Sequence, residues 1–195
     1  METLATKWIP IIDKFKKVPG IEIEIRLGRK SRTGFDTNVG PESFGRALRA
    51  LNKYEGWEKK THGTSTVYYF EGSKRLVVDE QTEEQIGQVK KRVQVDDFSP
   101  DDFPFDLRLG VSTEEPFEYD GEETSNKQRT RERWSFVRKN LSIDMTIVKG
   151  TPDDKDADDD TTYQVEMEIV SPPVLGGKNE TFNLLYKVFD LMKVM

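Results

Sequence analysis

From residue 64 to residue 149 of this 195-residue chain, segments with the alternating pattern of β-strands follow one another with no helical pattern between them. The predicted strands cover residues 21–30, 64–70, 74–79, 86–95, 105–114, 128–139, 141–149 and 163–170. Helical spacing of apolar residues is confined to 4–15, 41–54 and 180–195. Roughly eight strands and three helices in this order predict an antiparallel α+β fold and argue against a doubly wound sheet.

The composition limits the kind of protein this is. A length of 195 residues suits one domain spanning 1–195, and equal hydrophobic and charged fractions of 34% mean that many charges face water or a wet interior. The net charge of −6 gives no general affinity for nucleic acid, so a polyanion must bind at a local basic patch. The absence of cysteine excludes disulfides and thiolate sites and fits an intracellular protein. No apolar run approaches the roughly 18 residues of a membrane span, and no signal-peptide pattern opens the chain.

Two predicted strands near opposite ends of the chain carry the same carboxylate spacing. Glu22 and Glu24 lie in the first, and Glu166 and Glu168 lie in the last. Side chains two residues apart on a strand point to the same side, so each pair projects from one face. Four carboxylates brought together repel one another strongly unless a cation joins them. The two strands therefore indicate a cation-binding site if the fold pairs them.

The polar faces of the other strands carry both signs of charge. Any one of them alone is typical of the solvated face of an ordinary antiparallel sheet. However, the three predicted helices need apolar surface to cover, and the apolar strand faces supply it. If the helices cover the outside of a closed barrel, the charged faces line its interior, and an eight-stranded barrel has room there for one small ligand. The inward side chains are then Lys90, Arg92, Arg108, Ser112, Glu114, Arg129, Arg131, Arg133, Asp144 and Thr146.

These residue types favour one kind of chemistry. Carboxylates suit hard cations such as Mg²⁺ or Mn²⁺, whereas the lack of cysteine and the single His62 disfavour zinc. Arginine and lysine suit phosphoryl oxygens, so the set indicates phosphoryl transfer to water. The acidic segment 153–160 lacks the glycine and glutamate of an EF-hand loop, and we predict that it is a solvated connection. Residues 176–178 lack the remainder of a P-loop.

The order of these motifs resembles that of the triphosphate tunnel metalloenzymes, an eight-stranded antiparallel β-barrel family with flanking helices. The two Glu-x-Glu strands, with Arg26 two residues after Glu24, resemble its first and last signature strands, and segments 106–116, 129–136 and 144–146 add support. The similarity is above all to the metal-dependent RNA triphosphatases of fungal and large-DNA-virus mRNA capping, and the compact length resembles the stand-alone viral form. The resemblance implies hydrolysis of the 5′-triphosphate end of RNA with Mg²⁺ or Mn²⁺, and a nucleoside triphosphatase side activity.

The resemblance also implies roles for individual residues. Glu22, Glu24 and Glu168 would hold the metal, Glu166 would hold a water on it, and Glu114 would orient the attacking water. Asp144 would brace a basic neighbour. The residues expected to hold phosphates are Arg26, Arg75, Lys90, Arg129, Arg131 and Arg133, of which Arg26 suits either the metal site or the phosphates. Strand phase alone favours Lys90 over Lys91 and Glu114 over Glu115.

Two other functions stay open at this point. A barrel of this kind also suits inorganic tripolyphosphate, thiamine triphosphate or free nucleotides, because a tunnel reads phosphates more than bases. A barrel that binds polyphosphate without turnover is the other alternative, although an anion binder gains nothing from four glutamates. Gln164 and Ser142 depart from the family pattern and leave the details of the phosphate contacts open. We further expect a viral protein inside a host cell, a monomer with no membrane contact, that hands its product to a guanylyltransferase.

Overall fold

The computed structural model describes residues 1–150 and 161–195, and within these ranges the chain forms nine β-strands and three α-helices. The helices are α1 (Glu2–Phe15), α2 (Pro41–Lys53) and α3 (Lys178–Met192). The strands are β1 (Ile21–Lys30), β2 (Phe35–Asp36), β3 (Lys59–Tyr69), β4 (Lys74–Asp79), β5 (Gln85–Phe98), β6 (Asp106–Pro116), β7 (Lys127–Arg138), β8 (Leu141–Gly150) and β9 (Thr162–Ile169). The predicted acidic connection 153–160 lies outside the described residues.

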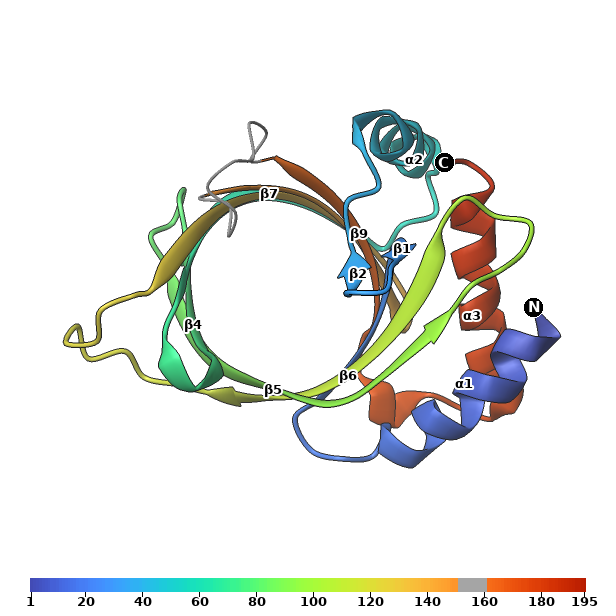
Figure 1. Cartoon of the computed structure of the whole chain (residues 1–195), viewed down its shortest axis with the longest axis horizontal. Coiled ribbons are helices and arrows are strands. Elements are labelled where there is room, and N and C mark those ends of the chain that lie inside the picture. The colour runs from blue at the N-terminus through green and yellow to red at the C-terminus, as the bar shows by residue number, and fades with distance from the viewer. Residues whose placement is uncertain (151–160) are drawn as a thin grey trace.

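The long strands close into an antiparallel barrel. They pair in the order β1-β6-β5-β4-β3-β7-β8-β9, and a further pairing of β1 with β9 joins the two edges, while the short β2 adds to β1. Figure 1 looks along the barrel and shows the ring of strands with the helices outside it. In the described part of the chain, the predicted eight-stranded antiparallel barrel with flanking helices is confirmed.

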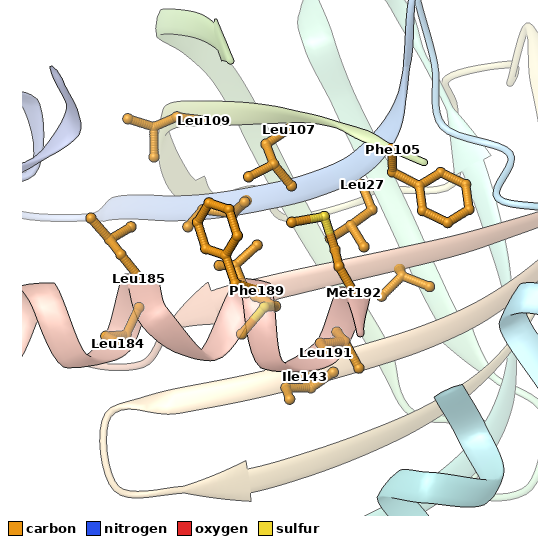
Figure 2. Close-up of a cluster of buried hydrophobic side chains, with 14 of the residues drawn as sticks. Leu27, Phe105, Leu107, Leu109, Ile143, Leu184, Leu185, Phe189, Leu191 and Met192 are labelled. Atoms are coloured by element: carbon orange, nitrogen blue, oxygen red, sulfur yellow. The ribbon is translucent and has the colours of Figure 1, made fainter. Parts of the chain in front are cut away.

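The helices cover the apolar outer faces of the strands on one side of the barrel. Ile23, Ile25 and Leu27 of β1 are fully buried there. Figure 2 shows side chains of α3, including Leu185 and Phe189, in one cluster with strand residues such as Leu27. Since neighbouring residues of a strand face opposite sides, the polar residues between them point into the barrel. No helix in the described ranges is long and apolar enough to span a membrane.

The segment 31–39, which lies between the predicted strand 21–30 and the predicted helix 41–54, contains the short strand β2. Gly28 makes its close approach possible: a Cβ atom at this position would lie 2.1 Å from the carbonyl oxygen of Asp36 and 2.5 Å from the ring of Phe35. The pairing of Lys30 with Phe35 places the Phe35 ring at one end of the barrel. The sequence pattern did not predict β2, because a strand of two residues leaves no alternation to detect.

A β-bulge changes the phase of β5. The alternating pattern predicts that Val95 shares a face with Val89 and Val93, opposite Lys90. The pairing with β6 shifts between Arg92 and Gln94, and beyond the shift Val95 pairs with Gly110 and lines the interior. One extra residue in a strand turns every later side chain to the other face, so the prediction for Val95 was wrong.

Candidate active site

The barrel encloses a cavity of about 160 Å³ with an almost entirely charged and polar lining. Tyr69, Val148 and Gln164 lie in the lining beside eleven of the twelve predicted site residues. Those eleven are Glu22, Glu24, Arg26, Arg75, Lys90, Arg129, Arg131, Arg133, Asp144, Glu166 and Glu168. The twelfth, Glu114, lies beside this lining and contacts Arg75 and Lys90.

The pairing of β1 with β9 brings the two Glu-x-Glu strands together. Glu24 is directly opposite Glu168, and Arg26 is directly opposite Glu166. Directly opposite residues on antiparallel strands share a face, so both carboxylate pairs point into the cavity. On β6, Gly110 faces Glu24, and a Cβ atom at position 110 would lie 3.2 Å from Glu24 Oε1. The glycine therefore leaves the room that the Glu24 side chain occupies.

Two basic side chains lie between these carboxylates. Arg26 Nε is 2.9 Å from Glu24 Oε1 and 3.0 Å from Glu166 Oε1. Lys90 Nζ contacts Glu22 and lies 3.5 Å from both Glu24 Oε2 and Glu114 Oε1. Burial and the neighbouring Glu166 raise the pKa of Glu24. Burial also acts to raise the pKa of Glu166, but Arg26 and Arg133 outweigh it and hold that pKa below its ordinary value.

Glu168 has no hydrogen-bond or ion-pair partner within the described ranges. Burial, together with the carboxylates of Glu22, Asp144 and Glu114, raises its pKa to about 7. No cationic side chain in the described ranges contacts Glu168 directly, and carboxylate oxygens are the donors that hard divalent cations prefer. Among residues 1–150 and 161–195, no three acidic side chains already stand in a geometry that could hold a metal ion. Lys90 and Arg26 contact oxygens of these carboxylates instead.

The arginines of β7 form the basic wall of the cavity. Arg133 donates hydrogen bonds to Thr146 Oγ1 (2.9 Å), Asp144 Oδ2 (3.1 Å) and Glu166 Oε2 (3.3 Å). Asp144 therefore contacts a basic neighbour, Arg133. Burial and the charge of Arg133 lower the pKa of Arg131 to about 10, and its buried Nε has no hydrogen-bond partner in the described part of the chain. An anion beside Arg131 would accept a hydrogen bond from Nε and would favour the charged form of the guanidinium.

Glu114 is fixed by two side chains on neighbouring strands. Arg75 Nη2 lies 2.5 Å from Glu114 Oε1, and Gln88 Nε2 donates a hydrogen bond of 3.2 Å to Glu114 Oε2. Gln88 Oε1 in turn accepts a hydrogen bond of 3.0 Å from Arg75 Nε. The adjacent Glu115 is exposed, and so is Lys91 beside Lys90. The strand phase that favoured Glu114 and Lys90 therefore matches the observed geometry.

Three residues of this region were not found from the sequence. Tyr69 lies in the cavity lining because it pairs with Arg75 across β3 and β4. Gln88 joins Arg75 to Glu114, and Gly110 makes room for Glu24. Only the strand register reveals these positions, because tyrosine, glutamine and glycine in a strand carry no distinctive signal of their own.

The two departures from the family pattern have polar partners. Gln164 Nε2 donates a hydrogen bond of 3.2 Å to Thr37 Oγ1, which ties β9 to the segment after β2. Ser142 Oγ donates a hydrogen bond of 2.8 Å to the buried Asp144 Oδ1. Both residues stabilise the cavity wall.

The sequence from residue 59 to residue 193, more than half of the chain, matches the family described as mRNA capping enzyme, beta chain. This chain belongs to the mRNA capping enzyme beta-chain family. The resemblance to the tunnel-type RNA triphosphatases of mRNA capping is thereby confirmed. No curated protein matches the sequence.

Solved structures of low sequence identity share the fold of this chain. The S. pombe Pct1 RNA triphosphatase superposes with a TM-score of 0.82 at 15% identity, over 100% of this chain and 92% of that chain. The Mimivirus capping enzyme triphosphatase superposes with a TM-score of 0.67 at 15% identity, over 100% of this chain and 97% of that chain. At such identities the likeness demonstrates a common fold.

Proposed function

We propose that this chain is a metal-dependent RNA 5′-triphosphatase that removes the γ-phosphate from the 5′-triphosphate end of RNA as the first step of mRNA capping. The observation that carries the proposal is the cavity lining, in which the carboxylates of β1 and β9 and the arginines of β7 surround one enclosed space. Membership of the capping-enzyme family supports the same reaction. The 5′-diphosphate product would then serve a guanylyltransferase.

Glu22, Glu24 and Glu168 would hold Mg²⁺ or Mn²⁺, since all three carboxylates line the cavity and Glu168 has no partner among the described residues. When bound, the ion would offset negative charge on the phosphoryl oxygens. Lys90 now contacts Glu22 and lies within 3.5 Å of Glu24. It would exchange these contacts for phosphate oxygens when the ion and the substrate enter.

The remaining residues would position the reacting groups. Arg131 and Arg133 would donate to the γ-phosphate and offset the charge that develops on its oxygens. Glu114, held by Arg75 and Gln88, would accept a hydrogen bond from the attacking water and fix its direction. The water oxygen bonds to the γ-phosphorus while the bond to the β–γ bridging oxygen breaks. The products are a 5′-diphosphate end and inorganic phosphate.

One assay tests the reaction and its alternatives. The protein is incubated with γ-labelled triphosphate RNA, GTP or inorganic tripolyphosphate in Mg²⁺ or Mn²⁺, with and without a chelator. We expect chelator-sensitive phosphate release from RNA that leaves a 5′-diphosphate end. Release from tripolyphosphate alone would instead favour a tunnel enzyme for small molecules. No release from any of the three would favour a barrel that only binds polyphosphate.

A further inference from the structure

A second cavity, of about 410 Å³, adjoins the catalytic cavity inside the barrel. The two share the lining residues Glu24, Arg26, Tyr69, Arg75 and Lys90. Among the further lining residues of the second cavity are Phe35, Phe70, Lys74, Arg92, Val95 and Arg108. Aromatic and aliphatic side chains thus join the basic ones where the phosphate-binding region ends. A chemical group bound here would be continuous with a phosphate chain in the catalytic cavity.

Two of these side chains stack on each other. The guanidinium carbon of Arg108 lies 4.5 Å from the centre of the Phe35 ring. Asp97 fixes this guanidinium by accepting two hydrogen bonds, of 2.7 and 3.0 Å. Nucleobases stack on aromatic rings and on guanidinium planes with little preference for base identity. The stacked pair of Phe35 and Arg108 therefore suits the base of a nucleoside, a group that inorganic tripolyphosphate lacks.

The basic residues of this cavity differ in their partners. Lys74 pairs with Glu123, and Arg108 pairs with Asp97. Arg92 is exposed and has no hydrogen-bond or ion-pair partner in the part of the chain that the structure describes. Its pairing with Ser112 turns it to the same side as Lys90. An arginine without a partner can donate hydrogen bonds to the phosphodiester that follows the first nucleoside of the substrate.

We propose that the second cavity binds the 5′-terminal nucleoside of the RNA. Its base would extend the stack of Phe35 and Arg108, and Arg92 would contact the phosphodiester that follows. This subsite rests on the proposed triphosphatase function and extends it, because it lets the enzyme distinguish a nucleotide end from inorganic polyphosphate.

Four variants and three substrates test the subsite. Phe35→Ala removes the ring, and Phe35→Leu keeps apolar bulk without a π face. Arg92→Ala removes the unpaired cation, and Lys91→Ala is its matched control on the opposite face of the same strand. Steady-state constants are measured for triphosphate RNA, GTP and tripolyphosphate, and those for RNA are repeated over a range of salt concentrations.

Each variant has its own expected pattern. Both Phe35 variants should raise KM for RNA and GTP by about tenfold and leave tripolyphosphate hydrolysis within about twofold of wild type. Arg92→Ala should raise KM for RNA alone by about fivefold and reduce the slope of log KM against log salt concentration by about 0.7. Lys91→Ala should match wild type on all three substrates.

An equal loss on all three substrates, or no change on RNA, would overturn the subsite while leaving the triphosphatase function intact. Wild-type protein that releases phosphate from none of the substrates would instead overturn the proposed function and the subsite with it.

Discussion

Glu24 and Glu168 lie directly opposite each other in the β1–β9 pairing that closes the barrel. One carboxylate comes from the first long strand and the other from the last, so they meet only when the ends of the sheet join. Formation of the proposed metal site and closure of the barrel are therefore the same structural event. Substitutions of these acidic residues can therefore be tested by their effects on both phosphate release and the melting temperature.

Glu168→Gln removes one proposed metal ligand at nearly constant side-chain volume. We expect phosphate release to fall at least about 100-fold, because a carboxylate ligand of the ion is lost. The melting temperature of metal-free protein should stay equal or rise, since Glu168 has no partner among the described residues and is buried beside other carboxylates. The increase in melting temperature that Mn²⁺ gives wild-type protein should be lost.

The matched control for this test is Glu115→Gln, an exposed residue on β6. Full activity in Glu168→Gln protein, or an unchanged response to Mn²⁺, would contradict the assignment of Glu168 to the metal site. Treatment of wild-type protein with EDTA should abolish activity, and excess Mn²⁺ should restore it.

Arg131→Ala should lower activity without lowering the melting temperature. Phosphate release should fall about 100-fold, because a donor to the transferring group is lost. The metal-free protein should melt at an equal or higher temperature, since the pKa of Arg131 is lowered by burial and by Arg133. Arg133→Ala should lower both activity and the melting temperature, the latter by at least about 5 °C, because Asp144 and Glu166 lose a partner. Phosphate release is measured by assay and the melting temperature by differential scanning fluorimetry. A lower melting temperature for Arg131→Ala than for wild type would contradict the expected difference between the two arginines.

Glu114→Gln tests the positioning of the attacking water. The amide keeps the size of the side chain but loses the negative charge that Arg75 and Lys90 contact. We expect kcat to fall by about 10²-fold or more with KM changed by less than about threefold, because the substrate phosphates do not depend on Glu114 for binding. A variant whose KM alone rises would show that Glu114 acts in binding instead.

Asp97→Asn should change the pH dependence of stability. Hydrogen bonds from Arg108, aided by its charge, hold the pKa of Asp97 below its ordinary value despite burial. A lowered folded-state pKa stabilises the fold above the unfolded-state pKa, and this contribution is lost as pH falls through the folded-state value. At pH 7 the variant should melt about 2–4 °C below wild type, and the difference should shrink below about pH 4. The exposed Asp101→Asn is the control, and a difference that is constant with pH would refute the role of Asp97.

Much of the fold was predictable because the alternating pattern survives in most strands. Ile23, Ile25 and Leu27 mark the outer face of β1 so clearly that the inward direction of Glu22 and Glu24 follows from them. Because the three helices must pack against apolar strand faces on the outside of the barrel, the polar faces were predicted to line its interior. These two arguments predict that most of the expected site residues face the interior, where eleven of the twelve line one cavity, whereas Arg75 was expected only from the family resemblance.

The parts that were missed depend on contacts across strands. The β-bulge after Arg92 turns Val95 inward, and the local sequence pattern does not indicate where such a bulge occurs. Phe35 was hidden in a polar segment, and its position depends on Gly28 in the neighbouring strand. The partners of charged residues were equally inaccessible, because Lys90 lies among carboxylates here although its residue type suggested a phosphate contact.

Closure of the barrel through β1 and β9 has a topological consequence for a polymer substrate. A complete ring of hydrogen-bonded strands offers no seam through which the middle of a polynucleotide can pass sideways. Only a terminus can be threaded towards the enclosed carboxylates. We therefore expect the internal phosphodiesters of an RNA to stay out of reach of these carboxylates, whatever their sequence.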